Sequence, residues 1–383
     1  MSAASLTDAV WEVLSHVNDP EIHKPITELD MVEKVEVDEA GLASVKVLLT
    51  ISGCPMKGTI EHDVHAALQG VEGLTGLDLE FGVMSDEQRA ELKTKLRGGV
   101  RERIIPFAAD DNLTQVILVA SGKGGVGKSS VTVNLAKALE ARGKSVGVLD
   151  ADIYGHSIPP MLGIADAEVT GIDDMILPVP VEGLKVISIG MLKQSRDQVI
   201  AWRGPILDRA LQQFLADVYW GDLDYLLVDL PPGTGDVAMS LGAKLPNAEV
   251  LVVTTPQQAA AEVAERAGTM ASMVDQKVIG VVENMAYLAA ECPHCGESHR
   301  VDLFGSGGGE RVAEALSLRL GYPIKLLAQV PIDAAVSASG DAGVPLVATD
   351  ADRPAARALD DLAEHLASRR RGLAGRKLSL HVS

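Results

Sequence analysis

Apolar residues recur over the first part of the chain with two different periods. Val10, Leu14 and Val17 follow a helical spacing, and a second helical set lies at residues 60–67. Elsewhere the spacing is that of β-strands, and we predict strands at 32–37, 45–51 and 77–81. From this order we predict a small α+β domain over residues 1–84.

A different pattern begins near Leu113. Short, nearly continuous apolar runs alternate with helical stretches, and these runs lie at 116–120, 146–149, 186–189, 225–228, 250–253, 278–282 and 324–330. Such runs are typical of parallel strands that helices cover on both faces. We therefore predict an α/β domain with a mostly parallel sheet over residues 113–366.

The segments that flank this α/β domain are polar. Residues 85–112 are rich in Glu, Lys and Arg and contain Gly98-Gly99, so we predict a linker there. Residues 367–383 form a basic tail, which we interpret as solvated. Its basic residues are Arg369, Arg370, Arg371, Arg376 and Lys377.

The composition argues against several classes of protein. The chain has 383 residues and a formal net charge of −19, which is unfavourable for coating nucleic acid. Met1 to Val17 lacks a basic start followed by an apolar run, and no segment approaches the roughly 20 apolar residues of a membrane helix. We therefore expect a cytoplasmic protein that binds neither nucleic acid nor a membrane. In a reducing compartment its cysteines would remain thiols, available for chemistry or metal.

A glycine-rich motif follows the first apolar run of the α/β domain. Residues 122–129 read Gly-Lys-Gly-Gly-Val-Gly-Lys-Ser and precede a helical stretch, Val131–Ala141. Glycines let backbone N–H groups surround a phosphate at a helix N-terminus. Lys128 would contact the β and γ phosphates, and the Ser129 hydroxyl would bind Mg²⁺. The sequence thus predicts a P-loop for ATP and magnesium, formed by Gly122, Lys123, Gly124, Gly125, Val126, Gly127, Lys128, Ser129 and Ser130.

Aspartates lie at the ends of two predicted strands. Asp150 and Asp152 end one strand, and Asp229 ends another. The carboxyl ends of parallel strands meet at one edge of a sheet, so these carboxylates are expected beside the P-loop. We assign Asp229, as the Walker B residue, to magnesium through water, and Asp150 to orienting its loop. Gly233 follows Asp229 closely and is placed to offer its amide to a γ phosphate.

Lys123 is a second lysine in the P-loop, and with it the loop resembles the deviant Walker A loop of the MinD, ParA and nitrogenase iron-protein class. The resemblance implies that Lys123 reaches across a dimer interface to the partner's phosphates, so that nucleotide drives homodimer formation. The alternative is an exposed lysine without a role. Asp152 matches the switch I aspartate that positions the attacking water or the metal, although it could merely cap a turn. The class also implies that Asn284 reads the adenine edge, and that Pro331 and Asp333 lie in a loop beside the base.

Cys292 and Cys295 form a Cys-x-x-Cys pair, and the sequence contains no second such pair. Two thiolates do not complete a four-coordinate metal site. Either His294 and His299 complete it, or a second subunit supplies two more thiolates. Four soft thiolates at a two-fold axis suit a [4Fe–4S] cluster, so we favour a cluster that bridges two subunits. Zinc, and a redox dithiol or structural pair, are the alternatives.

These motifs together resemble the Mrp/ApbC-type iron–sulfur cluster carriers of the wider Mrp/Nbp family. The matching segments are 122–129, 150–155, 202–205, 228–236, 282–285, 292–295 and 304–309. The resemblance implies a slowly hydrolysing ATPase that assembles a cluster on a homodimer and hands it to apo iron–sulfur proteins. His156 departs from the family, since many relatives have proline there, and Arg203 has no physical role that we assign.

The N-terminal domain resembles the small domain of iron–sulfur assembly factors, through Asp19-Pro20-Glu21 and Thr50–Met56. Cys54 lies where a turn meets a helix start, a setting that lowers the pKa of a thiol. We therefore expect an accessory thiol that accepts or passes on iron, sulfide or a cluster. The alternative is a buried structural cysteine.

Two other functions share the predicted nucleotide site. A partitioning or positioning ATPase like ParA or MinD would act on DNA or membrane. The acidic charge and the lack of a clear amphipathic C-terminal membrane helix count against it. A nucleotide-binding scaffold without turnover is the third possibility.

Overall fold

The structure is a computed structural model that divides into two compact units. It describes residues 3–51, 53–96, 104–109, 111–152, 155–173, 175–192, 204–233, 235–258, 266, 274, 276–292 and 294–369. The first unit comprises residues 1–103, 169–180 and 217–221, and the second comprises the remainder. Within the described ranges, every helix is too short or too polar to span a bilayer.

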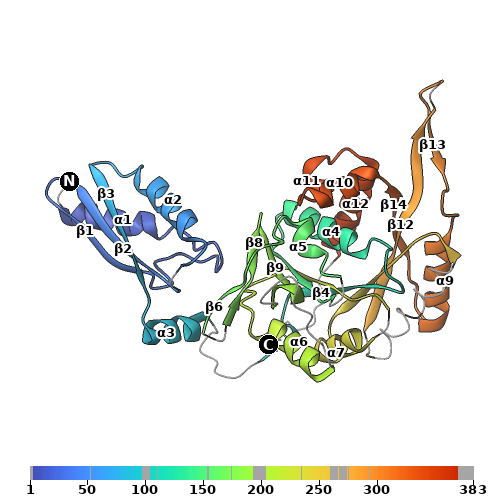
Figure 1. The fold of residues 1–383 in the computed structure, drawn as a ribbon, viewed down its shortest axis with the longest axis horizontal. Helices are drawn as coiled ribbons and strands as arrows, with labels where there is room; N and C mark the ends of the chain where they lie inside the picture. Colours follow the sequence, from blue (N-terminus) through green and yellow to red (C-terminus); the bar gives the residue numbers. More distant parts are fainter. Residues whose placement is uncertain are drawn as a thin grey trace, which may run out of the picture. The chain divides into compact units, whose positions relative to one another are not determined.

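The first unit is a small α+β fold around a three-stranded sheet, in the order β1-β2-β3 (Figure 1). Strand β2 pairs antiparallel with β1 and parallel with β3. Ala43, Val45 and Val47 alternate along β2 and are buried, as the period of two requires. The elements are α1 (Ala3–Leu14), β1 (Val32–Val37), β2 (Leu42–Leu49), α2 (Lys57–Leu68), β3 (Gly76–Val83), α3 (Asp86–Leu96), β6 (Thr170–Ile172) and β7 (Met175–Leu177).

Two features of this unit differ from the sequence-based boundaries. Helix α3 lies inside the segment predicted as a linker, and its Leu92 is buried in the core of the unit. The β6–β7 pair comes from far along the chain, yet its Ile172 and Leu177 belong to the same core. Gly98-Gly99 lies outside the described residues.

The second unit is built on a nine-stranded, mostly parallel sheet, which confirms the predicted fold class. The strand order is β13-β12-β11-β4-β10-β5-β9-β8, with β14 pairing with β12. The middle positions of the central strands are Val, Ile, Leu and Ala and are buried, as both faces of a covered parallel sheet require. The strands are β4 (Gln115–Ser121), β5 (Val146–Asp150), β8 (Val179–Val181), β9 (Leu184–Ser188), β10 (Tyr225–Asp229), β11 (Glu249–Thr254), β12 (Lys277–Glu291), β13 (Ser298–Val301) and β14 (Leu326–Ile332).

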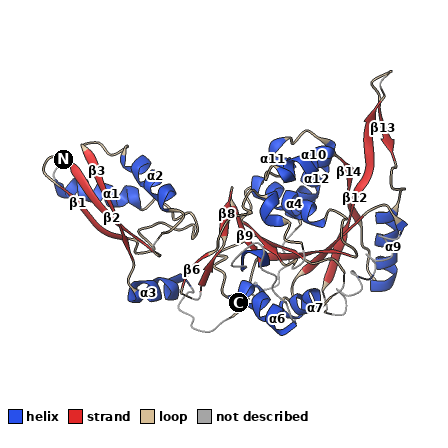
Figure 2. Cartoon of the chain, in the orientation of Figure 1, coloured by secondary structure: helices blue, strands red, loops and turns tan. Residues whose placement is uncertain are grey.

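Helices cover both faces of this sheet. Figure 2 shows α4 and α12 on one face and α6 and α7 on the other. Helix α12 has a wholly apolar buried stripe that joins the core cluster containing α4 and the central strands. The described elements are η1 (Pro106–Ala108), α4 (Lys128–Ala141), α5 (Ile158–Met161), η2 (Ile189–Leu192), α6 (Gly204–Ala216), α7 (Asp236–Lys244), α9 (Gly308–Leu320), α10 (Ala334–Asp341), α11 (Leu346–Thr349) and α12 (Pro354–Ser368).

The C-terminal part of the chain corrects two predictions. Pro331 lies within strand β14 and not in a loop, because the β12–β14 pairing continues past it to Ile332. Arg369, which we placed in the solvated tail, pairs with Glu249 and is partly buried. The other basic residues of the tail lie outside the described residues.

Candidate functional site

The P-loop lies where the sequence places it, between β4 and α4. Gly125 and Gly127 have φ angles of 80° and 76°, the left-handed region that glycine adopts without strain. A Cβ atom at Gly127 would lie 2.2 Å from Nδ2 of Asn284, so a side chain there would collide. The motif therefore forms a tight backbone loop at a helix N-terminus, the arrangement that binds phosphate.

Asp229 is the centre of the polar contacts behind this loop. Its side chain is fully buried, and it accepts hydrogen bonds from the hydroxyls of Ser129 (2.6 Å) and Thr132 (2.9 Å). The Lys128 Nζ lies 2.6 Å from Asp229 Oδ1, as a buried ion pair. Within the described part of the chain, however, no acceptor meets this ammonium with hydrogen-bond geometry.

The residues of this centre fit a magnesium-bound nucleoside triphosphate. The Lys128 ammonium has unused donors, and the glycine loop beside it presents backbone amides for phosphate. Ser129 and Asp229 provide a hydroxyl and a carboxylate, which are the oxygen ligands that Mg²⁺ takes together with water and phosphate. Thr132, one helical turn after Lys128, escaped the sequence-based assignment. Its spacing on the helix is the signal that could have found it.

Two further aspartates lie on β5 and in the loop after it. Asp150 stands beside Asp229 in the sheet register and accepts from the Ser188 hydroxyl and the Asp152 N–H. Burial raises the pKa of Asp150 to about 7, and the Asp229 carboxylate adds to this rise. Asp150 thus orients its loop, as we expected. Asp152 is 8% exposed and accepts from the Gly155 N–H, while Ile153 and Tyr154 lie outside the described residues.

His156, the departure from the family pattern, lies against this loop. Its Nδ1 is 3.0 Å from the carbonyl oxygen of Asp152. Its ring is also close to Gly190, where a Cβ would lie 2.8 Å from it. The histidine therefore packs between Asp152 and Gly190.

Lys123 and Gly233 make contacts within the chain, which leave their predicted contacts with phosphates as predictions. The Lys123 Nζ donates to Gln257 Oε1 (2.9 Å), which lies just after β11. The Gly233 N–H donates to the Ser121 carbonyl (2.9 Å), so the predicted contact with a γ phosphate would require this bond to break. Gly233 has a φ of 94°, and Thr234, which follows it, lies outside the described residues.

The residues predicted to surround the base serve other contacts. Asn284 is 8% exposed, and its Nδ2 donates to the Val126 carbonyl (2.9 Å), so it supports the P-loop. Asp333 is the N-cap of α10 and forms a two-point pair with Arg353 at 2.7 and 2.8 Å. An adenine contact to Asn284 would use the remaining amide atoms, because one donor is already occupied.

Cys292 and Cys295 lie at the tip of a β-hairpin. We use the term cysteine hairpin for residues 288–301, in which the end of β12 pairs antiparallel with β13. Figure 1 shows this hairpin projecting from the sheet. Cys295 is exposed and Cys292 is half-buried. The backbone N–H groups of Cys295 and His294 lower the pKa of Cys292, which favours its thiolate.

The hairpin tip alone offers too few ligands for a metal centre. Among the residues that the structure describes, no three His, Cys, Asp or Glu side chains are grouped so that they could hold a metal ion. His299 lies opposite Ala290 in the β-ladder, and His294 and Cys295 are both exposed. A zinc site completed by the histidines of the same chain is therefore not formed in this structure. Pro293 lies outside the described residues.

Cys54, in the first unit, corrects a prediction about reactivity. It is 9% exposed, and burial raises the pKa of its thiol. The N–H groups of Met56 and Lys57 lower the pKa, as expected at a helix start, but the carboxylates of Glu21 and Asp19 oppose them. Cys54 is thus a buried and mainly protonated thiol. Ser52 lies outside the described residues.

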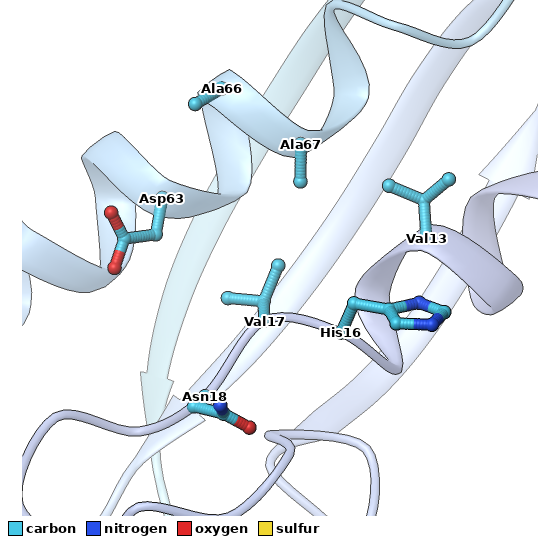
Figure 3. Close-up of a pocket in the computed structure, with 7 residues that line it drawn as sticks. All are labelled: Val13, His16, Val17, Asn18, Asp63, Ala66 and Ala67. Carbon is cyan, nitrogen blue, oxygen red and sulfur yellow. The ribbon is translucent and has the colours of Figure 1, made fainter. Parts of the chain in front are cut away.

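The first unit also contains a cavity of about 500 Å³ beside α1 and α2. Figure 3 shows the residues that line it, which are Val13, His16, Val17, Asn18, Asp63, Ala66 and Ala67. Cys54 does not line this cavity, so we assign the cavity no part in the chemistry of that thiol.

Comparison with known proteins gives consistent matches to both units. A family model described as NUBPL iron-transfer P-loop NTPase matches residues 112–367, and one described as iron-sulfur cluster assembly protein matches residues 7–77. The chain is 52% identical over 382 residues to the iron-sulfur cluster carrier protein of Mycobacterium leprae, covering 100% of this chain and 98% of that protein. It is 43% identical over 363 residues to the protein of the same name from Deinococcus radiodurans, covering 94% and 95%.

A solved structure also resembles the second unit. The nucleotide-binding protein of Archaeoglobus fulgidus, in complex with ADP, is 38% identical, with a TM-score of 0.50. The match covers 62% of this chain and 92% of that protein.

Proposed function

The chain belongs to the family of iron–sulfur cluster carrier proteins, which are P-loop NTPases of the ParA and MinD class, and we propose that it is a homodimeric ATPase that loads a cluster and delivers it to apo-proteins. Magnesium-bound ATP would occupy the P-loop. Cys292 and Cys295 of two subunits would together hold a [4Fe–4S] cluster, which is the cargo.

One observation supports this proposal above the others. In the second unit Lys128, Ser129 and Thr132 converge on the buried Asp229 behind the P-loop, whereas the cysteine hairpin presents two thiols with no third ligand among the described residues. A second copy of the hairpin would supply the two missing ligands, because four thiolates satisfy a cluster of this kind.

In the nucleotide site, the residues of the chain bind and orient the substrate. Lys128 would leave its ion pair with Asp229 for the phosphates, and Ser129 with Asp229 would hold magnesium, which stabilises the charge on the transferred phosphoryl group. Asp152 would position the attacking water. Lys123 would exchange its hydrogen bond with Gln257 for the nucleotide of the partner subunit.

The proposal is tested by anaerobic reconstitution with iron, sulfide and a reductant. We expect about four iron and four sulfide per dimer, and light scattering should show a dimer when ATP is present. Lys123→Ala should still bind ATP but should hydrolyse it at least about tenfold more slowly. The reason is that the variant lacks the ammonium that would contact the transferred phosphate. Lys277→Ala, which alters a lysine at the start of β12, is the matched control.

Three outcomes would contradict the proposal. A protein that takes up zinc but never iron is not a carrier of clusters. A complete cluster in a protein that stays monomeric with ATP and iron present would rule out the shared site. ATP-driven dimerisation without any iron uptake would instead favour a partitioning or positioning ATPase.

A further inference from the structure

Strand β12 connects the P-loop to the cysteine hairpin within one chain. Near the middle of the strand, Asn284 donates to the Val126 carbonyl (2.9 Å) and packs against Gly127. Four residues later, at Leu288, the same strand enters the hairpin. A shift of the P-loop backbone on nucleotide binding would therefore act first on Asn284.

The residue before Asn284 is a carboxylate that no nucleotide role accounts for. Glu283 is fully buried in the sheet. Its Oε1 accepts the N–H of Gly309 at the start of α9 (2.8 Å), and its Oε2 accepts the Nε2 of Gln329 on β14 (2.6 Å). A buried carboxylate that uses both oxygens in this way holds its two neighbours firmly.

Gln329 extends these contacts to the cysteine hairpin. Its Oε1 accepts from Nη1 of Arg300, on β13, at 3.3 Å. The Arg300 guanidinium also lies over the Tyr287 ring, 4.3 Å from the ring centre, and pairs with Asp302. Arg300 stands opposite Ala289 in the hairpin ladder. Ala289 itself lies three residues before Cys292 in the sequence.

A bulge in β12 lies between the two ends of this chain of contacts. Asn284 pairs with Val330, but Leu288 pairs with Ile332, so β12 has two extra residues over this interval. Met285 lies inside this interval and has a φ of 55°, a backbone angle that a residue other than glycine adopts only at a cost in free energy. Bulges of this kind re-aim the strand that follows them.

From this geometry we propose that Glu283, Gln329 and Arg300 are positioning residues that set the hairpin's orientation according to the nucleotide state of the P-loop. We use the term linkage for Glu283, Gln329 and Arg300 with the hydrogen bonds between them. Its role rests on the proposed function, whereas its contacts lie in a single chain. Nucleotide would displace the loop at Val126, the bulge would change shape, and the linkage would carry the change to Arg300. Both cysteines would then move together with the hairpin.

The test uses the cluster-free, reduced full-length protein, so it does not depend on iron. Alkylation of Cys295 by N-ethylmaleimide is timed by mass spectrometry with no nucleotide, with Mg²⁺ and ADP, and with Mg²⁺ and a non-hydrolysable ATP analogue. Dilute protein, shown to be monomeric by light scattering, excludes protection by a partner subunit. Cys54 is the internal reference, because it lies in the other unit and is buried.

In the wild type we expect the alkylation rate of Cys295 with the analogue to differ about fivefold from the rate without nucleotide. This is at the lower end of typical coupling between sites. In Gln329→Ala and in Arg300→Ala the rates with the analogue and without nucleotide should agree to within about twofold. The affinity for the analogue should be unchanged. Arg319→Ala, which removes an exposed arginine from the last turn of α9, should keep the wild-type ratio. A purely structural role would lower stability without altering this ratio.

The proposal is overturned if both linkage variants keep the wild-type ratio, or if nucleotide leaves the alkylation of Cys295 unchanged in the wild type. Should Gln329→Ala fail to fold, the exposed Arg300 decides the question alone. Failure of the protein to acquire iron would contradict the proposed function and leave this result standing, because the thiol measurement needs no cluster.

Discussion

The nucleotide site and the cysteine hairpin occupy the same unit but are built in opposite ways. The centre of the nucleotide site is buried: Lys128 is 6% exposed and Asp229 is fully buried, and Lys128, Ser129 and Thr132 all contact Asp229. The hairpin tip is open, with Cys295 exposed and its sulfur 3.8 Å from Glu297. The contacts of Ser129 and Thr132 with Asp229 form without a ligand, which limits the ordering cost of binding, while Lys128 would exchange Asp229 for phosphate.

This difference suits the two ligands of the proposed function, the nucleotide and the cluster. A nucleotide must be held in one geometry for phosphoryl transfer, so rigid contacts are favourable. In the proposed function the cluster is delivered to another protein and must remain accessible, and an exposed site shared by two chains would open when they separate. The comparison predicts that the two sites can be disabled separately.

The largest effect should come from Cys292→Ala. Removing one thiolate from each subunit leaves two ligands in place of four, so iron and sulfide content should fall to background. ATP affinity should stay within about twofold of the wild type, because the hairpin tip makes no contact with the P-loop that we describe. Iron and sulfide assays with calorimetric titration of ATP measure both quantities.

Cys54→Ala is the matched control for this variant. It also removes a thiol, but one in the other unit, and we expect normal cluster content. If Cys292→Ala lost ATP binding along with the cluster, the two sites would not be separate and the comparison would break.

Lys128→Ala should produce the reverse pattern. The ammonium makes charge-assisted bonds to phosphate, so ATP affinity should fall by about 100-fold, corresponding to about 2.7 kcal/mol. Cluster assembly in the absence of nucleotide should remain. Titration calorimetry and iron content of the same sample give the two results.

Lys137→Ala, on the same helix, is the control for Lys128→Ala. Its ammonium pairs with Glu140 and Glu182 away from the P-loop, and ATP binding should be retained. Unfolding of both variants is followed as well, because removing Lys128 leaves the buried Asp229 carboxylate without its cation. ATP affinity equal to the wild type in Lys128→Ala would show that the P-loop assignment is wrong.

The sequence predicted those parts of the site that are encoded locally. The P-loop is a contiguous motif, and Asp229 ends an apolar run, so both could be placed from spacing alone. The strands of the sheet likewise have a clear apolar pattern. The family was also recognised, because its motifs span most of the second unit.

Contacts between distant residues could not be predicted in this way. Thr132 reaches Asp229 across 97 residues, and Glu283 reaches Gln329 across 46. The sequence gives no register for β14, and so Pro331 was placed in a loop. Cys54 was misjudged for a similar reason: its helix start is local, but the burial that outweighs it depends on the packing of the whole unit.

The two kinds of thiol should differ in reactivity by at least about tenfold at pH 7. Cys292 has a lowered pKa because backbone N–H groups stabilise its thiolate, whereas burial raises the pKa of Cys54. Raising the pH from 7 to 9 should therefore accelerate Cys54 by the larger factor, since less of it is ionised at the start. Site-resolved alkylation of the unfolded chain, in which the two thiols should react at similar rates, is the control. Equal rates in the folded protein would mean that burial does not protect Cys54.

The last effect concerns stability, and it comes from keeping Asp150 protonated beside Asp229 when no magnesium is bound. Asp150 would ionise near 3.8 in the unfolded chain but retains its proton to about pH 7 in the folded protein. As pH rises from about 4 to 7, the unfolded state therefore loses a proton that the folded state keeps, and stability falls.

Asp150→Asn cannot ionise and should escape this loss. We compare the two proteins without nucleotide or Mg²⁺. The free energy of unfolding of the variant minus that of the wild type should rise by about 2 kcal/mol from pH 5 to pH 8. Urea unfolding at the two pH values measures it, with Asp78→Asn, at an exposed position on β3, as the control that should show no such shift. A constant difference would mean that Asp150 is ionised throughout. The buried site would then hold two carboxylate charges with Lys128 as their nearby cation, and the cost of its organisation would lie elsewhere.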